Sequence, residues 1–207
     1  MPTKRLMNYM ILAIAVIAIF SAGCSERNPD EALVWNEKGE FLEKEEKHYE
    51  AIQAFDKAIE LDPQLLEARY NKADALIALF KYEEAIQTYD EIIELNPQDV
   101  DAWSYKGYLL AINLKKYDEA IQAFDKVMEF DSQASSGPGS MYRQAVDGKV
   151  KCLVLQGKYD EALQTADKAT EEDSQYKKYY WGLKGFTYHE MGNDKESQEW
   201  YDKANEL

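Results

Sequence analysis

One phrase recurs along the chain and constrains its fold more than any other feature. The copies are HYEAIQAFDKAIELDP at 48–63, YEEAIQTYDEIIELNP at 82–97, YDEAIQAFDKVMEFDS at 117–132, YDEALQTADKATEEDS at 159–174 and, more weakly, DKESQEWYDKANEL at 194–207. Aligned on one small residue (Ala51, Ala85, Ala120, Ala162, Ser197), the copies are separated by 34, 35, 42 and 35 residues. Because apolar residues recur at helical spacing within this period, we expect a linear array of helical units.

The period and its fixed slots resemble the tetratricopeptide repeat. The matching residues are an aromatic early in the first helix (Trp35, Trp103, Trp181), a small residue one turn later (Gly39, Ala73, Gly107, Gly185), a large residue in the second helix (Phe55, Tyr89, Phe124, Tyr201) and a closing proline (Pro63, Pro97). The fourth repeat departs most, with Val150 in the small slot and Ala166 in the large one. The resemblance implies an all-α fold, a right-handed α–α superhelix (solenoid) of five helix-turn-helix units that bury their apolar faces by stacking.

The array is expected to cover 32–207, with repeats at about 32–65, 66–99, 100–134, 143–177 and 178–207 and a loop at 135–142. The wide separation of the third and fourth copies comes with SSGPGS at 135–140, which predicts a break between helices. This segment is either a tolerated surface loop or a hinge between blocks of three and two repeats. One extra residue between Gly107 and Ala120 predicts a longer turn inside repeat three.

The last repeat differs from the others on the face that would meet a following repeat. One slot of the second helix reads Ile52, Ile86, Ile121 and Leu163 and then Gln198, and another reads Ile59, Ile93, Met128 and Thr170 and then Asn205. We therefore expect the helix near 195–206 to cap the array, and the chain to be complete.

The N-terminus resembles a prokaryotic lipoprotein signal. Lys4 and Arg5 precede an apolar run from Met10 to Phe20, and the small residues Ala22 and Gly23 lead to Cys24. This pattern predicts a signal peptide at 1–23 and a lipidated tether at 24–31, with Cys24 as the acylated residue. Ser21 stands where such signals usually have Leu, so a single uncleaved transmembrane anchor and release by cleavage stay open. The expected location is the cell membrane or envelope, outside the cytoplasm.

Composition removes several classes of function. The chain has 39 acidic and 24 basic residues, a net charge of −15, and therefore no surplus of cations with which to bind nucleic acid. Two cysteines cannot make a disulfide scaffold, and two histidines offer little for zinc. We expect no metal site and no cofactor.

No catalytic motif is present, so the chain is expected not to be an enzyme. His189 and Glu190 begin like a zinc-protease motif, but Asn193 stands in the place of its second histidine. Cys152 lies among apolar residues and is expected to be a buried thiol, and His48 to be a ring packed in a turn. One aspartate per repeat, namely Asp56, Asp90, Asp125, Asp167 and Asp202, is interpreted as a solvated outer face.

The family resemblance implies a role in holding other proteins, with the first helices lining a groove. Counted from the Trp35 slot, the groove candidates are Asn36, Glu40, Tyr70, Asn71, Asp74, Tyr105, Tyr108, Lys151, Phe186 and His189. This aromatic and acidic lining predicts a peptide or helix of another protein, rich in basic or amide groups. Two further hypotheses are a self-assembling structural element of the cell envelope and an accessory subunit of an enzyme complex.

Overall fold

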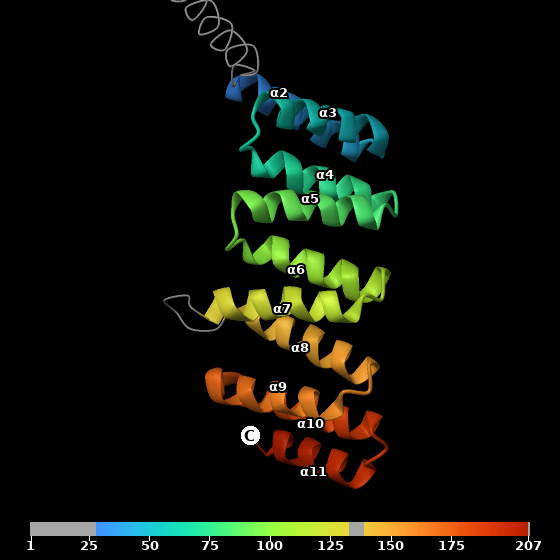
Figure 1. The fold of residues 1–207 in the computed structure, drawn as a ribbon, viewed down its shortest axis with the longest axis vertical. Helices are drawn as coiled ribbons and strands as arrows, with labels where there is room; N and C mark the ends of the chain where they lie inside the picture. Colours follow the sequence, from blue (N-terminus) through green and yellow to red (C-terminus); the bar gives the residue numbers. More distant parts are fainter. Residues whose placement is uncertain (1–27, 133–138, 207) are drawn as a thin grey trace, which may run out of the picture. The chain divides into compact units, whose positions relative to one another are not determined.

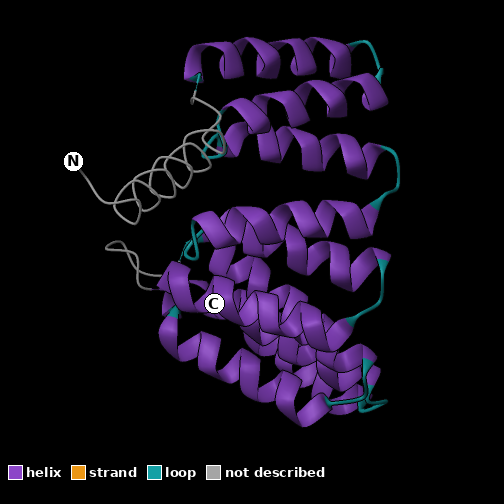
Figure 2. Ribbon diagram, turned by 45° about the horizontal axis from the view of Figure 1, so that its top comes forward, coloured by secondary structure: helices purple, strands orange, loops and turns teal. Residues whose placement is uncertain are grey.

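A computed structural model describes residues 28–132 and 139–206, which form ten α-helices and no strand (Figures 1 and 2). The first and second helices of the five repeats are α2 (Pro29–Lys44) and α3 (His48–Leu61), α4 (Leu66–Ala78) and α5 (Tyr82–Leu95), α6 (Val100–Tyr108) and α7 (Tyr117–Ser132), α8 (Ser140–Leu155) and α9 (Tyr159–Glu172), and α10 (Lys177–Glu190) and α11 (Asp194–Asn205). These helices fall into two compact units, divided after Phe80. The predicted all-α repeat fold is confirmed.

The same three-residue turn joins the two helices of every repeat. Its middle residue has a left-handed backbone: φ is 59° at Glu46 and Phe80, 55° at Lys115, 72° at Gly157 and 79° at Gly192. The extra residue of repeat three does not lengthen this turn, contrary to the prediction. The extra residue lies instead at the end of the first helix of this repeat, where η1 (Leu109–Asn113) forms a π-helical turn. A π turn holds one more residue than an α turn, so the turn that follows keeps its geometry.

Two helices begin earlier than the sequence indicated. Helix α2 begins at Pro29, inside the predicted tether, because Asn28 caps it by accepting a hydrogen bond from the Glu31 amide at 3.3 Å. Helix α8 begins at Ser140, inside the predicted loop at 135–142. The Asp131 carboxylate of α7 accepts hydrogen bonds from the amides of Gly139 and Tyr142 at 2.8 and 2.7 Å, and so holds the start of α8.

Small and large residues are paired within a repeat. A Cβ atom added at Gly39, Gly107 or Gly185 would lie 2.3, 2.8 or 2.9 Å from the ring of Phe55, Phe124 or Tyr201. Glycine is therefore required for the two helices to approach so closely. Repeat four reverses the sizes, since Val150 and Ala166 are both fully buried in one cluster. The two departures of this repeat from the family pattern therefore compensate each other in volume.

In the first four repeats, the aspartate of the second helix forms an ion pair. It binds a lysine of the following first helix, which forms a Lys–Asp ladder between repeats. The pairs are Lys72–Asp56 at 2.7 Å, Lys106–Asp90, Lys149–Asp125 at 2.6 Å and Lys184–Asp167 at 2.6 Å. In the last helix Asp202 instead accepts a hydrogen bond from Gln198 at 2.8 Å. The side chains of Asp56, Asp90, Asp125 and Asp167 remain 46–56% exposed, so these residues do lie on an outer face, and their pairing with lysine is what the sequence interpretation did not include.

The polar slots of α11 are exposed, as expected. Gln198 and Asn205 both face solvent within the described residues, whereas the aliphatic side chains in the same slots of earlier repeats, such as Ile86 and Ile121, are half-buried.

Candidate partner-binding surfaces

In the first unit, three of the predicted groove residues form one polar network. Asn36 of α2 donates to the Glu40 carboxylate at 2.9 Å, and Asn71 of α4 donates to the Asn36 side-chain oxygen at 3.0 Å and to Glu40 at 3.3 Å. Asn36 is only 2% exposed, so it fixes its neighbours and is not available to a partner. Glu40 and Asn71 are half-buried and remain accessible.

Next to this network lies an acidic cavity of about 350 Å³ lined by Glu40, Glu43, Lys44, Phe55, Asn71 and Asp74. Burial, and after it the negative charge of Glu43, raises the pKa of Asp74. Glu43 also contacts His48 at 2.9 Å, which gives that half-buried ring in the turn a definite partner. Tyr70 is half-buried on α4. The first unit therefore brings together the acidic and amide candidates and could attract a cation or an amide.

In the second unit, Tyr108 of α6 lies beside a cluster formed by α8 and α10. Its hydroxyl donates to the Gln144 carbonyl at 3.2 Å, and burial followed by the charge of Asp147 raises its pKa. The pKa of Tyr179 is also raised, first by burial and then by the charge of Asp147 and a hydrogen bond to it. Lys151 pairs with Asp147 at 2.7 Å. Tyr108, Asp147 and Tyr179 are named here the tyrosine cluster.

An apolar cavity of about 600 Å³ adjoins the tyrosine cluster. It is lined by Gln175, Tyr176, Lys178, Tyr179, Gly182 and Leu183. A Cβ atom added at Gly182 would have no neighbour within 4 Å, so no other side chain fills the cavity at this position. Arg143 lies over the Tyr176 ring at 3.6 Å from its centroid and holds one wall in place.

Sequence reasoning missed Asp147, Tyr179 and Gly182. Among the predicted groove residues, Asn36 and Tyr70 directly follow the aromatic slot of their repeats. The same rule applied to the fourth and fifth repeats gives Asp147 and Gly182, so the signal was present. Tyr179 lies two residues before Trp181, on the first turn of α10, where no rule was applied.

The remaining candidates are more scattered. Tyr105 stacks on Tyr89 of α5, with ring centroids 5.6 Å apart, and so covers the core. Phe186 packs against the core of the second unit, and the exposed His189 lies 3.3 Å from Asp194. Neither is placed in the tyrosine cluster.

The residues considered for chemistry have structural environments. Cys152 is 2% exposed, which confirms the predicted buried thiol, and burial raises the pKa of that thiol to about 11. Within residues 28–132 and 139–206, no three His, Cys, Asp or Glu side chains are grouped so that they could hold a metal ion.

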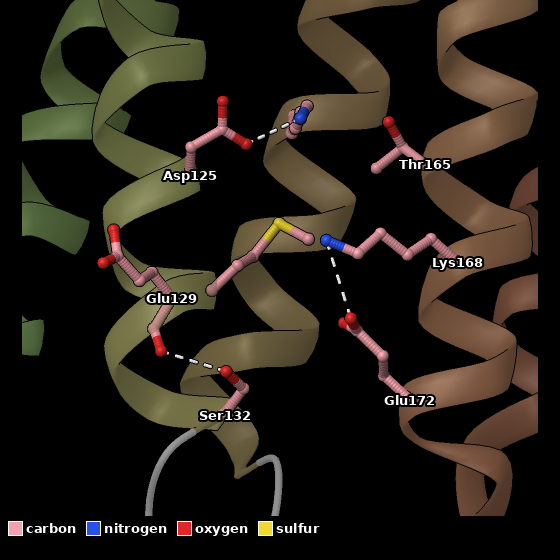
Figure 3. Close-up of a pocket in the computed structure, with 8 residues that line it drawn as sticks. Asp125, Glu129, Ser132, Thr165, Lys168 and Glu172 are labelled. Carbon is pink, nitrogen blue, oxygen red and sulfur yellow. Dashed lines mark hydrogen bonds and ion pairs between the residues drawn. The ribbon is translucent and has the colours of Figure 1, made fainter.

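A separate, polar cavity of about 430 Å³ lies between α7 and α9 (Figure 3). Asp125, Met128, Glu129 and Ser132 of α7 form one wall, and Lys149, Thr165, Lys168 and Glu172 of α8 and α9 form the other. Its charges are already paired, Lys149 with Asp125 and Lys168 with Glu172 at 3.5 Å. This cavity is therefore a seam between repeats and not an evident ligand site.

The chain belongs to the tetratricopeptide repeat family. Two models of this repeat match it, one at residues 42–107 and the other at 100–133 and 179–207, which together make up more than half of the sequence. Neither is a model of a catalytic family.

Known proteins of similar sequence or structure agree with this assignment. A peroxisomal targeting signal receptor of Kluyveromyces lactis is 46% identical over 48 residues, which are 23% of this chain and 8% of the receptor. YrrB, a TPR protein with an unusual peptide-binding site, is 23% identical with a TM-score of 0.61 over 86% of this chain and 87% of YrrB. MamA of Desulfovibrio magneticus is 19% identical with a TM-score of 0.64 over 86% of this chain and 95% of MamA. The structural likenesses show the fold, and the family models support a protein-interaction scaffold of the TPR type.

Proposed function

We propose that this protein is a scaffold that binds an extended segment of a partner protein through the tyrosine cluster and the adjoining apolar cavity of α10. The observation that carries the proposal is the convergence of Tyr108, Asp147 and Tyr179 from three first helices beside a cavity of about 600 Å³. Tyrosine rings supply rigid contact area at little cost in side-chain entropy, and the carboxylate fixes orientation. YrrB, which has the same fold, provides a precedent for peptide binding.

The partner is proposed to be rich in basic or amide groups. Glu40, Glu43 and Asp74 line the cavity of the first unit, where Lys44 is the only basic lining residue. The whole chain is acidic, and such a field accelerates encounter with a cationic partner and weakens as salt is added.

The scaffold is further proposed to be tethered to a membrane, outside the cytoplasm, by a lipid on Cys24. This residue and the apolar run before it lie outside the described residues. In the part of the chain that the structure describes, no helix is both long and apolar enough to cross a bilayer. Membrane fractionation of Cys24→Ala tests the tether. Release of the variant from the membrane supports lipidation, and retention after a high-salt wash supports a spanning anchor.

The binding proposal is tested by capture of partners with the full-length chain and with Tyr108→Ala plus Tyr179→Ala. Loss of the captured protein in the double variant supports the tyrosine cluster as the binding surface. Tyr49→Ala on α3 is the control, since it removes another exposed tyrosine from a different helix. Unchanged capture by the double variant would contradict the proposal.

Sedimentation of the full-length chain over a range of concentrations distinguishes this scaffold from a self-assembling element of the envelope. A monomer at all concentrations favours the scaffold. Assembly that the double variant abolishes would favour the structural role.

A further inference from the structure

From α4 onward, each first helix has three slots that face the second helix of the preceding repeat, named here the stacking face. In chain order its members are Ala68, Lys72 and Ala75 in α4, Ala102, Lys106 and Leu109 at and just after the end of α6, Ala145, Lys149 and Cys152 in α8, and Tyr180, Lys184 and Thr187 in α10. The members other than lysine are between 0% and 7% exposed. The lysines form the Lys–Asp ladder. The stacking face is thus a fixed pattern of a buried residue, a paired lysine and a second buried residue.

Helix α2 carries the same pattern, but no described residue covers it. Val34 and Phe41 occupy the two buried slots and are 63% and 59% exposed. Lys38 occupies the lysine slot and forms no ion pair within residues 28–132 and 139–206; its ammonium lies 4.2 Å from the centroid of the Trp35 ring. Larger apolar side chains than the alanines of α4 therefore face outward beside a lysine that lacks its aspartate.

The cavity in Figure 3 lies beside a covered stacking face, that of α8. Lys149 of that face lines the cavity together with Thr165 and Lys168 of α9, and α7 supplies the remaining wall. The residues at the same slots of repeat one are Lys38, Ala54 and Lys57, and they line a cavity of about 520 Å³. All residues lining this second cavity come from α2 and α3, so the wall that α7 supplies in repeat four has no counterpart among the described residues.

We propose that the stacking face of α2 is a docking site for an amphipathic helix of a partner protein. The four internal interfaces define the chemistry of this helix. The covering helices have an aspartate with an apolar residue four positions before it and, in three of the four, another three positions after it, as in Ile52–Asp56–Ile59 and Ile86–Asp90–Ile93. The acid would pair with Lys38, and the apolar residues would cover Val34 and Phe41. This site is separate from the tyrosine cluster and does not depend on the proposed function.

The rest of this chain offers no helix of that pattern. Residues 1–27 contain one acid, Glu26, three positions before α2 begins. Helix α11 has Asp202 at the ladder slot, but its flanking slots are the polar Gln198 and Asn205. The second helices that do fit already cover a first helix of their own array. Charge and pattern together therefore favour a different protein over a second copy.

The experiment measures fluorescence anisotropy of a labelled peptide on the full-length chain, held in phosphatidylcholine nanodiscs because of its apolar N-terminal run. The probe is the sequence of residues 82–95, kept helical by Gln87→Lys and a lactam to Glu91, two positions that are exposed on α5 and lie about 100° around the helix from Ile86 and Asp90. Binding is expected to the wild-type chain. It is expected to weaken by about 10-fold or more in Val34→Ser plus Phe41→Ser, because both apolar contacts are lost.

A charge exchange tests the register. The same probe carrying Asp90→Lys is expected to bind the wild-type chain weakly and to recover on Lys38→Asp, because the ion pair is restored in reverse. Ile112→Ser plus Leu155→Ser is the matched control, since it removes two equally exposed apolar side chains from the second unit (69% and 66%), and it is expected to leave binding of the original probe unchanged. Circular dichroism checks that each variant remains folded.

The proposal would be overturned by equal binding of the probe to the wild-type chain and the double serine variant, or by no recovery of binding in the charge exchange. A wild-type dimer that the double serine variant dissolves would overturn it by assigning the face to a second copy of the chain. Flotation of the chain with phosphatidylglycerol vesicles that the same variant abolishes would overturn it by assigning the face to a lipid surface.

Discussion

The stacking faces of α2 and α4 have the same slots but opposite side-chain sizes. Ala75 of α4 is fully buried in a cluster with Ala51, Ile52 and Phe55, whereas Phe41 at the same slot of α2 is 59% exposed. Ala75 leaves room for the ring of Phe55, which packs against it from α3. No described residue of a preceding repeat packs against Phe41, so nothing limits its size. Exposure at this slot, together with size in this pair of helices, therefore separates the covered face from the open one.

The largest expected effect comes from giving α4 the residue of α2. Ala75→Phe forces a ring into a site that is already filled by Phe55 and Ile52, and we expect it to lower the free energy of unfolding by about 3 kcal/mol. The reciprocal change, Phe41→Ala, removes an exposed ring and is expected to cost less than about 0.5 kcal/mol. Urea unfolding followed by circular dichroism measures both. Equal losses would mean that α2 is covered in the same way as α4.

Cys152 provides a chemical probe of the same slot, since it stands in α8 where Phe41 stands in α2. Burial raises the pKa of its thiol to about 11, so at pH 8 little thiolate is present to react. Alkylation by iodoacetamide is expected to be slower at Cys152 than at Phe41→Cys by on the order of 100-fold, from ionisation alone.

The rates of alkylation at the two sites should also depend differently on pH. A raised pKa keeps the Cys152 thiol protonated, so its rate should continue to rise as pH approaches 11, whereas the rate at Phe41→Cys should level off above about pH 9. Mass spectrometry of the peptides separates these sites from Cys24. Similar rates and profiles at the two sites would show that the slot is not covered in α8 or not open in α2.

The sequence predicted the array well because its determinants are local and repeated. The turn, the small residue and the large residue of a repeat recur at a fixed spacing, so a pattern found in one repeat predicts the same structure in the others. What it missed depends on pairs of positions. The exchange of volume between Val150 and Ala166, and the pairing of Lys72 with Asp56, join residues of different helices and become visible only when the helices are in contact. The repeated lysine was nevertheless a signal, because five lysines stand at one slot.

The lysine of the stacking face should contribute to stability mainly where that face is covered. Lys184 is 7% exposed, lies 2.6 Å from Asp167 and covers the Trp200 ring at 3.6 Å, so Lys184→Ala is expected to lower the free energy of unfolding by about 2 kcal/mol. Lys38→Ala on the open face is expected to cost about 0.5 kcal/mol, because only an exposed contact with Trp35 is lost. Thermal unfolding ranks the two variants. A cost at Lys38 that matched the cost at Lys184 would contradict the comparison.

The candidate site was predicted less well than the fold. Binding residues need only be accessible and close to one another, and these properties follow no period. The slot rule placed Asn36 in the groove, yet its side chain is buried by the network it forms with Glu40 and Asn71. The rule also missed Tyr179, which meets Asp147 across two helices.

The smallest effect on stability is expected at the other open face, on α11. Gln198 and Asn205 are exposed and polar where the second helices of most earlier repeats have aliphatic residues. Gln198→Ile plus Asn205→Ile should change the free energy of unfolding by no more than about 0.5 kcal/mol, since no described residue contacts the new side chains from a following repeat. It should, however, promote association between copies, because the variant recreates beside Asp202 the apolar and acidic pattern that the stacking face of α2 is proposed to recognise. Sedimentation velocity would then show concentration-dependent assembly, and adding Lys38→Asp would reduce it. If Lys38→Asp left this assembly unchanged, the new apolar surface of α11 would join copies without using α2. Hydrophobicity alone, and not recognition of Asp202 by Lys38, would then explain the association.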